Sequence, residues 1–264
     1  MNWISEKTGK LLADYLNEPS GKYEAWSTAH PDVLARCLQK GDVLLVDGHL
    51  RVSVAIKYIT QSTWSHAALY VGDALPAPQP GSEANVLIEA DLNDGVIAVP
   101  LSKYAGLNTR ICRPVRLTPE DSEKVVQFAT ESLGAQYDLK NVIDLMRYLL
   151  PTPPVPVRFR RRLLALGSGD PTRAICSTLI AQAFQLVAYP ILPVITSETV
   201  AGSHYTRECL HIRHHSLFAP RDFDVSPYFE IIKPTLAEGF NYKALNWVSE
   251  KPEHRPLNPT VVAQ

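Results

Sequence analysis

Hydrophobic positions recur with a strand-like spacing through the first half of this chain. Between residues 43 and 115, short apolar runs are closed by Gly, Asp or Pro, which is typical of strands separated by turns. The predicted strands cover residues 43–46, 66–71, 85–90, 96–100 and 110–115. The loop 74–84 is rich in Pro, Gly and Ser and is expected to be an exposed connection between two of them.

Helical spacing dominates elsewhere. Thr118-Pro119-Glu120-Asp121 is a strong helix start, with Thr as N-cap and Pro in the first turn, and Gly134 is expected to end that helix. Further helices are predicted over residues 51–61, 138–150 and 175–187, and residues 1–40 form a helical N-terminal segment in which His30-Pro31-Asp32 opens a short helix.

The domain organisation follows from these patterns. We predict an N-terminal helical segment (1–40), a catalytic domain (41–235) and a C-terminal extension (236–264). Within the catalytic domain, residues 151–173 are rich in Pro and Arg and are expected to be an insertion or lid. No clear order is predicted beyond residue 188.

Composition limits the class of protein. The chain has 264 residues, 45% apolar residues, 20% charged residues and a formal net charge of -1, as in an ordinary globular protein. The four cysteines are scattered, without a CxxC pair or metal-type spacing, so neither a disulfide scaffold nor a metal site is expected. The sequence shows no secretory signal and no apolar run of about 20 residues, so the expected location is the cytoplasm.

Cys176 is the first candidate for chemistry. It precedes the apolar face formed by Leu179, Ile180 and Ala183, and so lies at the front of a predicted helix. A helix N-terminus, helped by Arg173, lowers a thiol pKa and favours the thiolate that nucleophilic catalysis needs. The alternative is a small buried residue at a helix start.

His66 and Glu89 are the candidates for proton transfer. His66 opens a predicted strand, and imidazole titrates near neutral pH, so it can accept a thiol proton. Glu89 is an acid inside an apolar strand, where an unpaired charge is costly. It either orients His66, as the acid of a catalytic triad does, or faces water from an edge strand.

Tyr137 and Cys37 each have a possible catalytic role and a structural alternative. Tyr137, between two predicted helices, either donates to a developing oxyanion or belongs to an ordinary turn. Cys37 also precedes His66, but it is expected in the middle of a helix, where no helix terminus activates it.

The order of these segments resembles a known family. Gly41-Asp42 before a strand, then SHAALYVG, LIEA, LGAQYD and ICSTLIAQAF, resembles the permuted members of the NlpC/P60 superfamily, specifically the YiiX/YebB-like (YaeF/YiiX) group of permuted papain-like amidases. The resemblance covers roughly residues 40–190, with a recognisable segment around residues 219–227. In this family the histidine strand precedes the cysteine helix.

The resemblance implies a fold, an activity and a set of site residues. The fold is α+β and papain-like, with an antiparallel sheet packed against the cysteine helix. The nucleophile maps to Cys176, the base to His66, the third polar residue to Glu89 and the family tyrosine to Tyr137. The implied activity is a cysteine hydrolase (a thiol protease or amidase) that cleaves an amide or peptide-like bond through a thioester. Two features depart from the family pattern and bear on the substrate. The position two residues after the cysteine, which is often acidic in relatives, is Thr178 here, and the stretch between Tyr137 and Cys176 carries the long insertion.

Two alternative functions remain open. The same cysteine in a lipid acyltransferase or thioesterase would use a basic and apolar patch, which contains Arg158, Arg160, Arg161, Arg162, Leu163, Leu164 and Leu166, for peripheral lipid contact. The second alternative is a catalytically silent module that binds lipid or peptide. No cofactor and no nucleic-acid partner are expected, and the oligomeric state is not indicated.

Three histidines lie close together in the sequence. If this segment were a helix, His211, His214 and His215 would share one face and could bind zinc, but beyond Glu208 and Cys209 no cysteine or acid nearby completes a ligand set. A solvated, weakly basic surface is the favoured interpretation.

Overall fold

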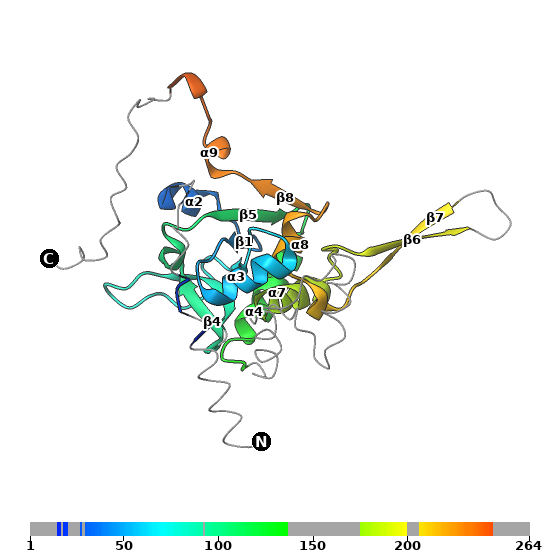
Figure 1. The fold of residues 1–264 in the computed structure, drawn as a ribbon, viewed down its shortest axis with the longest axis horizontal. Coiled ribbons are helices and arrows are strands. Elements are labelled where there is room, and N and C mark those ends of the chain that lie inside the picture. Colours follow the sequence, from blue (N-terminus) through cyan, green and yellow to red (C-terminus); the bar gives the residue numbers. More distant parts are fainter. Residues whose placement is uncertain are drawn as a thin grey trace, which may run out of the picture.

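A six-stranded antiparallel sheet forms the centre of the molecule, with the strand order β4-β3-β2-β1-β5-β8 (Figure 1). The computed structural model describes residues 15, 16, 18–20, 27, 30–91, 93–136, 175–199 and 206–244. The strands of the sheet are β1 (Val43–Val46), β2 (His66–Tyr70), β3 (Asn85–Asp91), β4 (Gly95–Pro100), β5 (Thr109–Pro114) and β8 (Phe229–Ile232).

Within the described residues, the sheet is accompanied by helices and a hairpin. The helices are α2 (Pro31–Cys37), α3 (Arg51–Thr60), η1 (Leu101–Tyr104), α4 (Pro119–Glu131), α7 (Ile175–Leu186), η2 (His215–Leu217), α8 (Pro220–Asp224), α9 (Pro234–Ala237) and η3 (Tyr242–Ala244). The hairpin consists of β6 (Val194–Thr199) and β7 (Thr206–His211), and it projects well away from the sheet (Figure 1). Mixed helices and an antiparallel sheet confirm the predicted α+β class.

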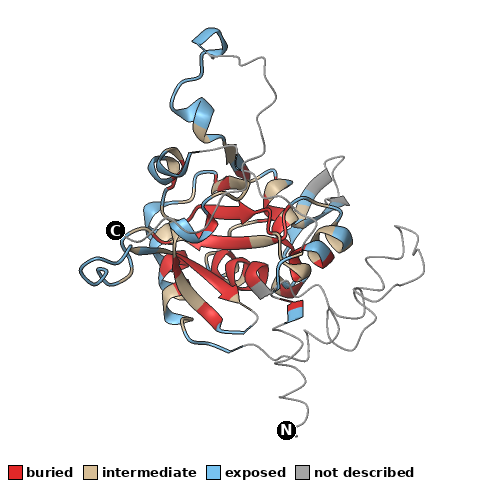
Figure 2. Cartoon of the chain, turned by 60° about the vertical axis from the view of Figure 1, so that its left-hand side comes forward, coloured by how far each residue is buried: buried red, intermediate tan, exposed pale blue. Residues whose placement is uncertain are grey.

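Each face of the sheet is covered by a separate apolar cluster, and the buried residues gather at the centre of the molecule (Figure 2). In β1, Val43 and Leu45 join the cluster with α4 and α7, whereas Leu44 and Val46 join the cluster with α2 and η1. Successive strand side chains point to opposite faces, so a strand covered on both sides must be apolar throughout. The uninterrupted run at residues 43–46 follows from this position.

The helices α4 and α2 both begin at a residue whose side chain caps the helix. Thr118 caps α4 by accepting a hydrogen bond from the Asp121 N–H at 3.2 Å, and Pro119 is its first residue. His30 caps α2 in the same way, through the Asp32 N–H. Both starts confirm their predictions, because an N-cap acceptor satisfies a backbone donor that has no partner within the helix.

The end of α4 is attached to the sheet through β4. The Val96 N–H donates to the Ala135 carbonyl at 3.0 Å, and the Gly134 N–H donates to the Val96 carbonyl at 2.9 Å. A Cβ on Gly95, whose φ is +73°, would lie 2.3 Å from the Ala135 oxygen. Only glycine tolerates both the backbone conformation and this close approach. The helix ends at Glu131, earlier than the predicted stop at Gly134.

The segment beyond residue 188 contains more order than the sequence predicted. It holds the β6–β7 hairpin, α8 and the edge strand β8, which pairs with β5 from Ile111–Ile232 to Pro114–Phe229. Cys37 is the last residue of α2, so its predicted position in the middle of a helix is wrong. The predicted helix 138–150, the insertion 151–173 and most of residues 1–29 and 245–264 lie outside the described residues.

In the part of the chain that the structure describes, no helix combines the length and the apolar character that crossing a membrane requires.

Candidate active site

His66 lies at the first position of β2, opposite Val46 of β1. The registered pairs between β2 and β3 are Leu69–Ile88 and Tyr70–Leu87, at the other end of β2. At the His66 end, β3 continues past these pairs to Asp91. The imidazole therefore occupies the end of the sheet, where β2 and β3 are no longer registered and side chains can meet between them.

Glu89 lies in β3, an internal strand, and is buried with 1% of its surface exposed. Its Oε2 is 3.2 Å from His66 Nε2. Burial alone raises the pKa of this carboxyl, but the neighbouring His66 and Lys103 outweigh it and lower the pKa below its usual value. The alternative of an edge-strand acid facing water is therefore wrong, and the structure brings Glu89 and His66 together.

Two further side chains, which the sequence analysis did not single out, also bind Glu89. Lys103 Nζ lies 2.5 Å from Oε1, and the Tyr104 hydroxyl donates to Oε2. Both belong to η1, directly after β4. The only sequence signal was the need of a buried acid for partners, and that signal does not say where in the chain the partners are.

Cys176 lies in the first turn of α7 and is 3% exposed. Its Sγ is 3.9 Å from the Ser177 hydroxyl oxygen. Burial raises the pKa of the thiol, but the charge and hydrogen bond of His66 outweigh it, with smaller contributions from the Ala67 backbone N–H and Ser177, so that the pKa is lowered.

The His66 pKa moves in the opposite direction. Burial favours the neutral ring, but the negative charges and hydrogen bonds of Cys176 and Glu89 dominate and raise the pKa to about 10. A lowered thiol pKa and a raised imidazole pKa together favour a thiolate beside an imidazolium, which is the reactive form of a cysteine nucleophile. Tyr137, the predicted oxyanion donor, lies outside the described residues.

The other cysteines have different surroundings. Cys112 is fully buried in β5, and burial raises its thiol pKa far above the ordinary range. Cys37 is half-buried at the end of α2, and its carbonyl accepts a hydrogen bond from Arg113 Nη2. Neither thiol has the imidazole that accompanies Cys176.

The histidines near residue 211 do not share a helix face, so that part of the interpretation is wrong. His211 ends β7 and its Nε2 is 2.7 Å from Thr196 Oγ1, whereas His214 contacts Ser216 and precedes η2. Among the described residues, no group of three or more His, Cys, Asp or Glu side chains is arranged to hold a metal ion.

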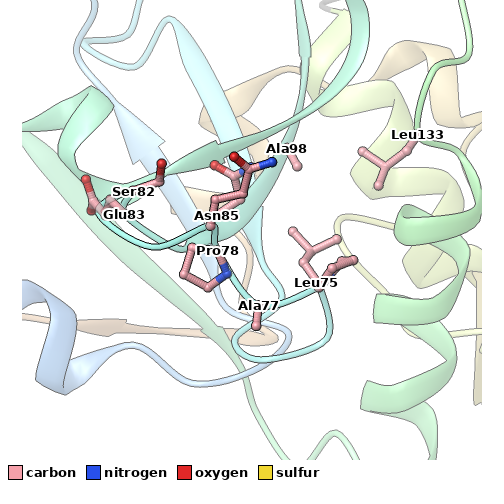
Figure 3. A pocket seen from close by; sticks show the side chains of 10 residues that line it. Leu75, Ala77, Pro78, Ser82, Glu83, Asn85, Ala98 and Leu133 are labelled. Atoms are coloured by element: carbon pink, nitrogen blue, oxygen red, sulfur yellow. The ribbon is translucent and has the colours of Figure 1, made fainter.

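A cavity of about 390 Å³ lies beside the loop that joins β2 to β3. Leu75 and Leu133 line one side of it, and Glu83 and Asn85 line the other (Figure 3). Its walls include none of His66, Glu89 and Cys176, so it is separate from the candidate active site. Residues 137–174, which precede α7 in the sequence, lie outside the described residues.

The antiparallel sheet, the packing of α7 on it and the order of His66 before Cys176 agree with the fold expected from the resemblance to circularly permuted papain-like proteins. The family described as permuted papain-like amidase enzyme, YaeF/YiiX, C92 family matches residues 37–148. This match agrees with the resemblance to the permuted papain-like amidases that the sequence motifs indicated. It includes the His66 and Glu89 strands and ends before Cys176.

Individual relatives are distant. The chain is 22% identical over 176 residues to the probable lipoprotein peptidase YaeF of Escherichia coli strain K12, covering 61% of this chain and 60% of that protein. The chain thus matches less than two thirds of the length of this curated relative. The crystal structure of the metalloprotein yiiX from Escherichia coli O157:H7 is 17% identical, with a TM-score of 0.43, over 74% of this chain and 96% of that one.

Proposed function

We propose that this protein is a thiol hydrolase that cleaves an amide or peptide-like acyl bond through Cys176, His66 and Glu89. The observation that carries the proposal is the position of His66, which interacts with the Cys176 thiol and with the buried Glu89 carboxylate. Support also comes from the permuted papain-like amidase family and from a relative named as a probable lipoprotein peptidase.

The reaction proceeds in two halves. The Cys176 thiolate attacks the acyl carbon, and the tetrahedral intermediate collapses when the His66 imidazolium protonates the leaving amine. The acyl group is now a thioester on Sγ, and His66 is neutral. His66 then takes a proton from water, the hydroxide attacks the thioester, and the carboxylic acid leaves as the thiolate and imidazolium are restored.

The nitrogen atoms of His66 divide these roles. Nε2 faces Glu89 at 3.2 Å, which leaves Nδ1 to exchange protons with the thiol, the amine and water. The Glu89 carboxylate fixes the orientation of the ring and stabilises its positive charge, as the acid of a catalytic triad does.

Stabilisation of the oxyanion is assigned to the Cys176 backbone N–H and Tyr137. Cys176 lies in the first turn of α7, where backbone N–H groups lack helical partners and the helix dipole favours negative charge. The assignment of Tyr137 follows from the family motif, since this residue lies outside the described residues.

Alkylation with iodoacetamide followed across pH, with adducts mapped by mass spectrometry, tests the nucleophile. Cys176 is expected to react at pH 6 more than about tenfold faster than in the denatured chain, because its thiolate fraction is larger. Cys112 serves as an internal control for a buried thiol without an imidazole. Equal rates for folded and denatured Cys176 would rule out an activated nucleophile.

The reaction class is tested with peptide anilides, simple thioesters and long-chain acyl donors, using wild-type protein and the Cys176→Ser variant. Turnover of anilides that is lost in Cys176→Ser supports the amidase. Transfer from lipid donors with a lasting acyl adduct supports the acyltransferase or thioesterase instead, and no turnover of any class supports the silent binding module. The patch from Arg158 to Leu166 that motivated the lipid alternative lies outside the described residues.

A further inference from the structure

The Glu89 carboxylate binds three donors at once. Lys103 Nζ contacts Oε1, whereas His66 Nε2 and the Tyr104 hydroxyl both contact Oε2. A buried carboxyl group without such partners would stay protonated and neutral. Here the lysine charge and the donated hydrogen bonds favour the ionised form, which is the form that stabilises an imidazolium.

The two donors from η1 differ in exposure. The Tyr104 ring is 6% exposed and packs among the apolar residues of the sheet face opposite α7, with its centroid 6.0 Å from that of His66. The Lys103 side chain is 38% exposed and reaches Glu89 from the edge of the site. Tyr104 therefore provides a fixed, dry contact, and Lys103 provides charge at the boundary with solvent.

Hydrogen bonds and the pairing of β3 with β4 fix the position of η1 beside Glu89. The Ser102 N–H donates to Glu83 Oε1 at 3.3 Å, and the Ala105 N–H donates to the Ser102 carbonyl at 2.9 Å. At the other end, β4 pairs with β3 up to Pro100–Asn85, immediately before η1 begins. Lys103 and Tyr104 are thus presented to Glu89 by the same strand pair that contains it.

We propose that Lys103 and Tyr104 are positioning residues of the active site, which act through Glu89 on His66. Together they keep the carboxylate ionised and keep Oε2 directed at the imidazole. The inference rests on the proposed function, since it assigns how the third member of the site is controlled. Neither residue touches the thiol in this scheme.

Removing each donor has a defined electrostatic consequence. Without the lysine charge, the pKa of Glu89 and the pKa of Cys176 both rise, so thiolate formation begins at higher pH. The pKa of His66 also rises, because a positive neighbour has been lost while Glu89 remains ionised at alkaline pH. A simple loosening of the site would instead lower the His66 pKa from about 10 toward its ordinary value of 6.5.

The experiment uses the full chain and two readouts. Lys103→Met, Tyr104→Phe and Lys103→Arg are compared with the matched controls Lys40→Met and Tyr189→Phe. Lys40 binds Asp73 and Glu123 on the surface, and the Tyr189 hydroxyl donates to two carbonyls, those of Val115 and Tyr228. The readouts are the pH dependence of Cys176 alkylation and the titration of labelled His66 by NMR, assigned with a His66→Gln sample.

Lys103→Met is expected to move both the alkylation midpoint and the His66 midpoint to higher pH by about one pH unit, which corresponds to about a tenfold slower alkylation near the wild-type midpoint. Tyr104→Phe is expected to move them in the same direction by less, because it removes a neutral donor. Lys103→Arg keeps the positive charge and is expected to have the wild-type midpoints. The controls Lys40→Met and Tyr189→Phe are expected to leave both midpoints unchanged.

Three outcomes would overturn the inference. Unchanged midpoints in Lys103→Met and Tyr104→Phe would show that Glu89 needs neither donor. A lower His66 midpoint would show a purely structural role, and faster alkylation at pH 6 would show that Lys103 competes with His66 for the carboxylate. Failure of the proposed function is distinguishable, because it would appear as an unreactive Cys176 in the wild type, while the His66 titration still reports on Lys103 and Tyr104.

Discussion

Asp42 and Arg113 form a bidentate ion pair at the start of β1. Arg113 Nε lies 2.9 Å from Oδ1 of Asp42, and Nη2 lies 2.7 Å from Oδ2. Asp42 is 1% exposed and immediately precedes β1, while Arg113 is in β5. The pair therefore ties the start of the central strand to its neighbour, at the end of β1 opposite from the Val46–His66 pair.

Arg113→Met is expected to lower the free energy of unfolding by about 3–5 kcal/mol at pH 7, because it leaves a buried carboxylate without its partner. Burial already raises the pKa of Asp42 despite Arg113, and loss of the arginine raises it further. The folded chain then binds a proton more readily than the unfolded chain, so the loss should shrink as the pH falls through this raised pKa. Urea unfolding at pH 7 and pH 5 measures both effects.

Arg36→Met is the matched control for that experiment. Arg36 pairs with Glu238, but the two side chains are 60% and 37% exposed. An exposed pair of this kind contributes about 0–1 kcal/mol, so a small, nearly pH-independent change is expected. Equal losses in the two variants would contradict the role assigned to burial.

Glu89→Gln is expected to move the His66 titration midpoint below its value of about 10. The substitution keeps the shape of the side chain but removes one of the two negative charges that raise the His66 pKa, so the imidazolium is lost at lower pH. The titration of labelled His66 by NMR measures the effect. The exposed Glu120→Gln is the control, and a wild-type midpoint in Glu89→Gln would remove Glu89 from the site.

Hydrolysis is expected to follow a bell-shaped pH profile. Its acid limb reports formation of the Cys176 thiolate, whose pKa is lowered, so activity is present well below the ordinary thiol range. Its alkaline limb reports loss of the His66 imidazolium at a pH of about 10, because the leaving amine then finds no acid. Measurement of kcat/KM against pH with an accepted amide substrate tests this, and an alkaline limb near pH 6.5 would contradict the raised imidazole pKa.

Gly95→Ala is expected to destabilise the fold by about 1–3 kcal/mol or more, because the new Cβ meets the Ala135 oxygen in a left-handed backbone conformation. Gly81→Ala is a useful comparison, since Gly81 has a φ of +86° but no atom within 4 Å of the added Cβ. It isolates the cost of the backbone conformation alone. Thermal unfolding of the two variants separates strain from steric conflict, and equal losses would show that the close contact with the Ala135 oxygen contributes nothing.

Much of the central sheet was predictable because local patterns and tertiary environment agree there. The run at residues 43–46 is apolar because both faces are covered, and the α4 start has a cap that acts within one turn. The assignments of His66 and Glu89 to strands depended on the same local patterns. Their closeness depended on the resemblance to the permuted amidases, since strand order is not a local property.

What the sequence did not predict is determined by contacts between distant segments. β8 is short, lies between Pro227 and Pro234, and exists as a strand because it pairs with the edge of β5. Lys103 and Tyr104 carry no recognisable motif, and their role follows only from where η1 meets β3. Both cases show tertiary pairing overriding weak local propensity.

The order of His66 before Cys176 also has a consequence for biosynthesis. Strands β1 to β5 and helix α4 leave the ribosome before α7 is translated, so the imidazole and carboxylate can be assembled while the nucleophile does not yet exist. The proposed nucleophile is therefore absent from the nascent chain until translation passes residue 176. The sheet gains its last strand, β8, only after α7 has been made.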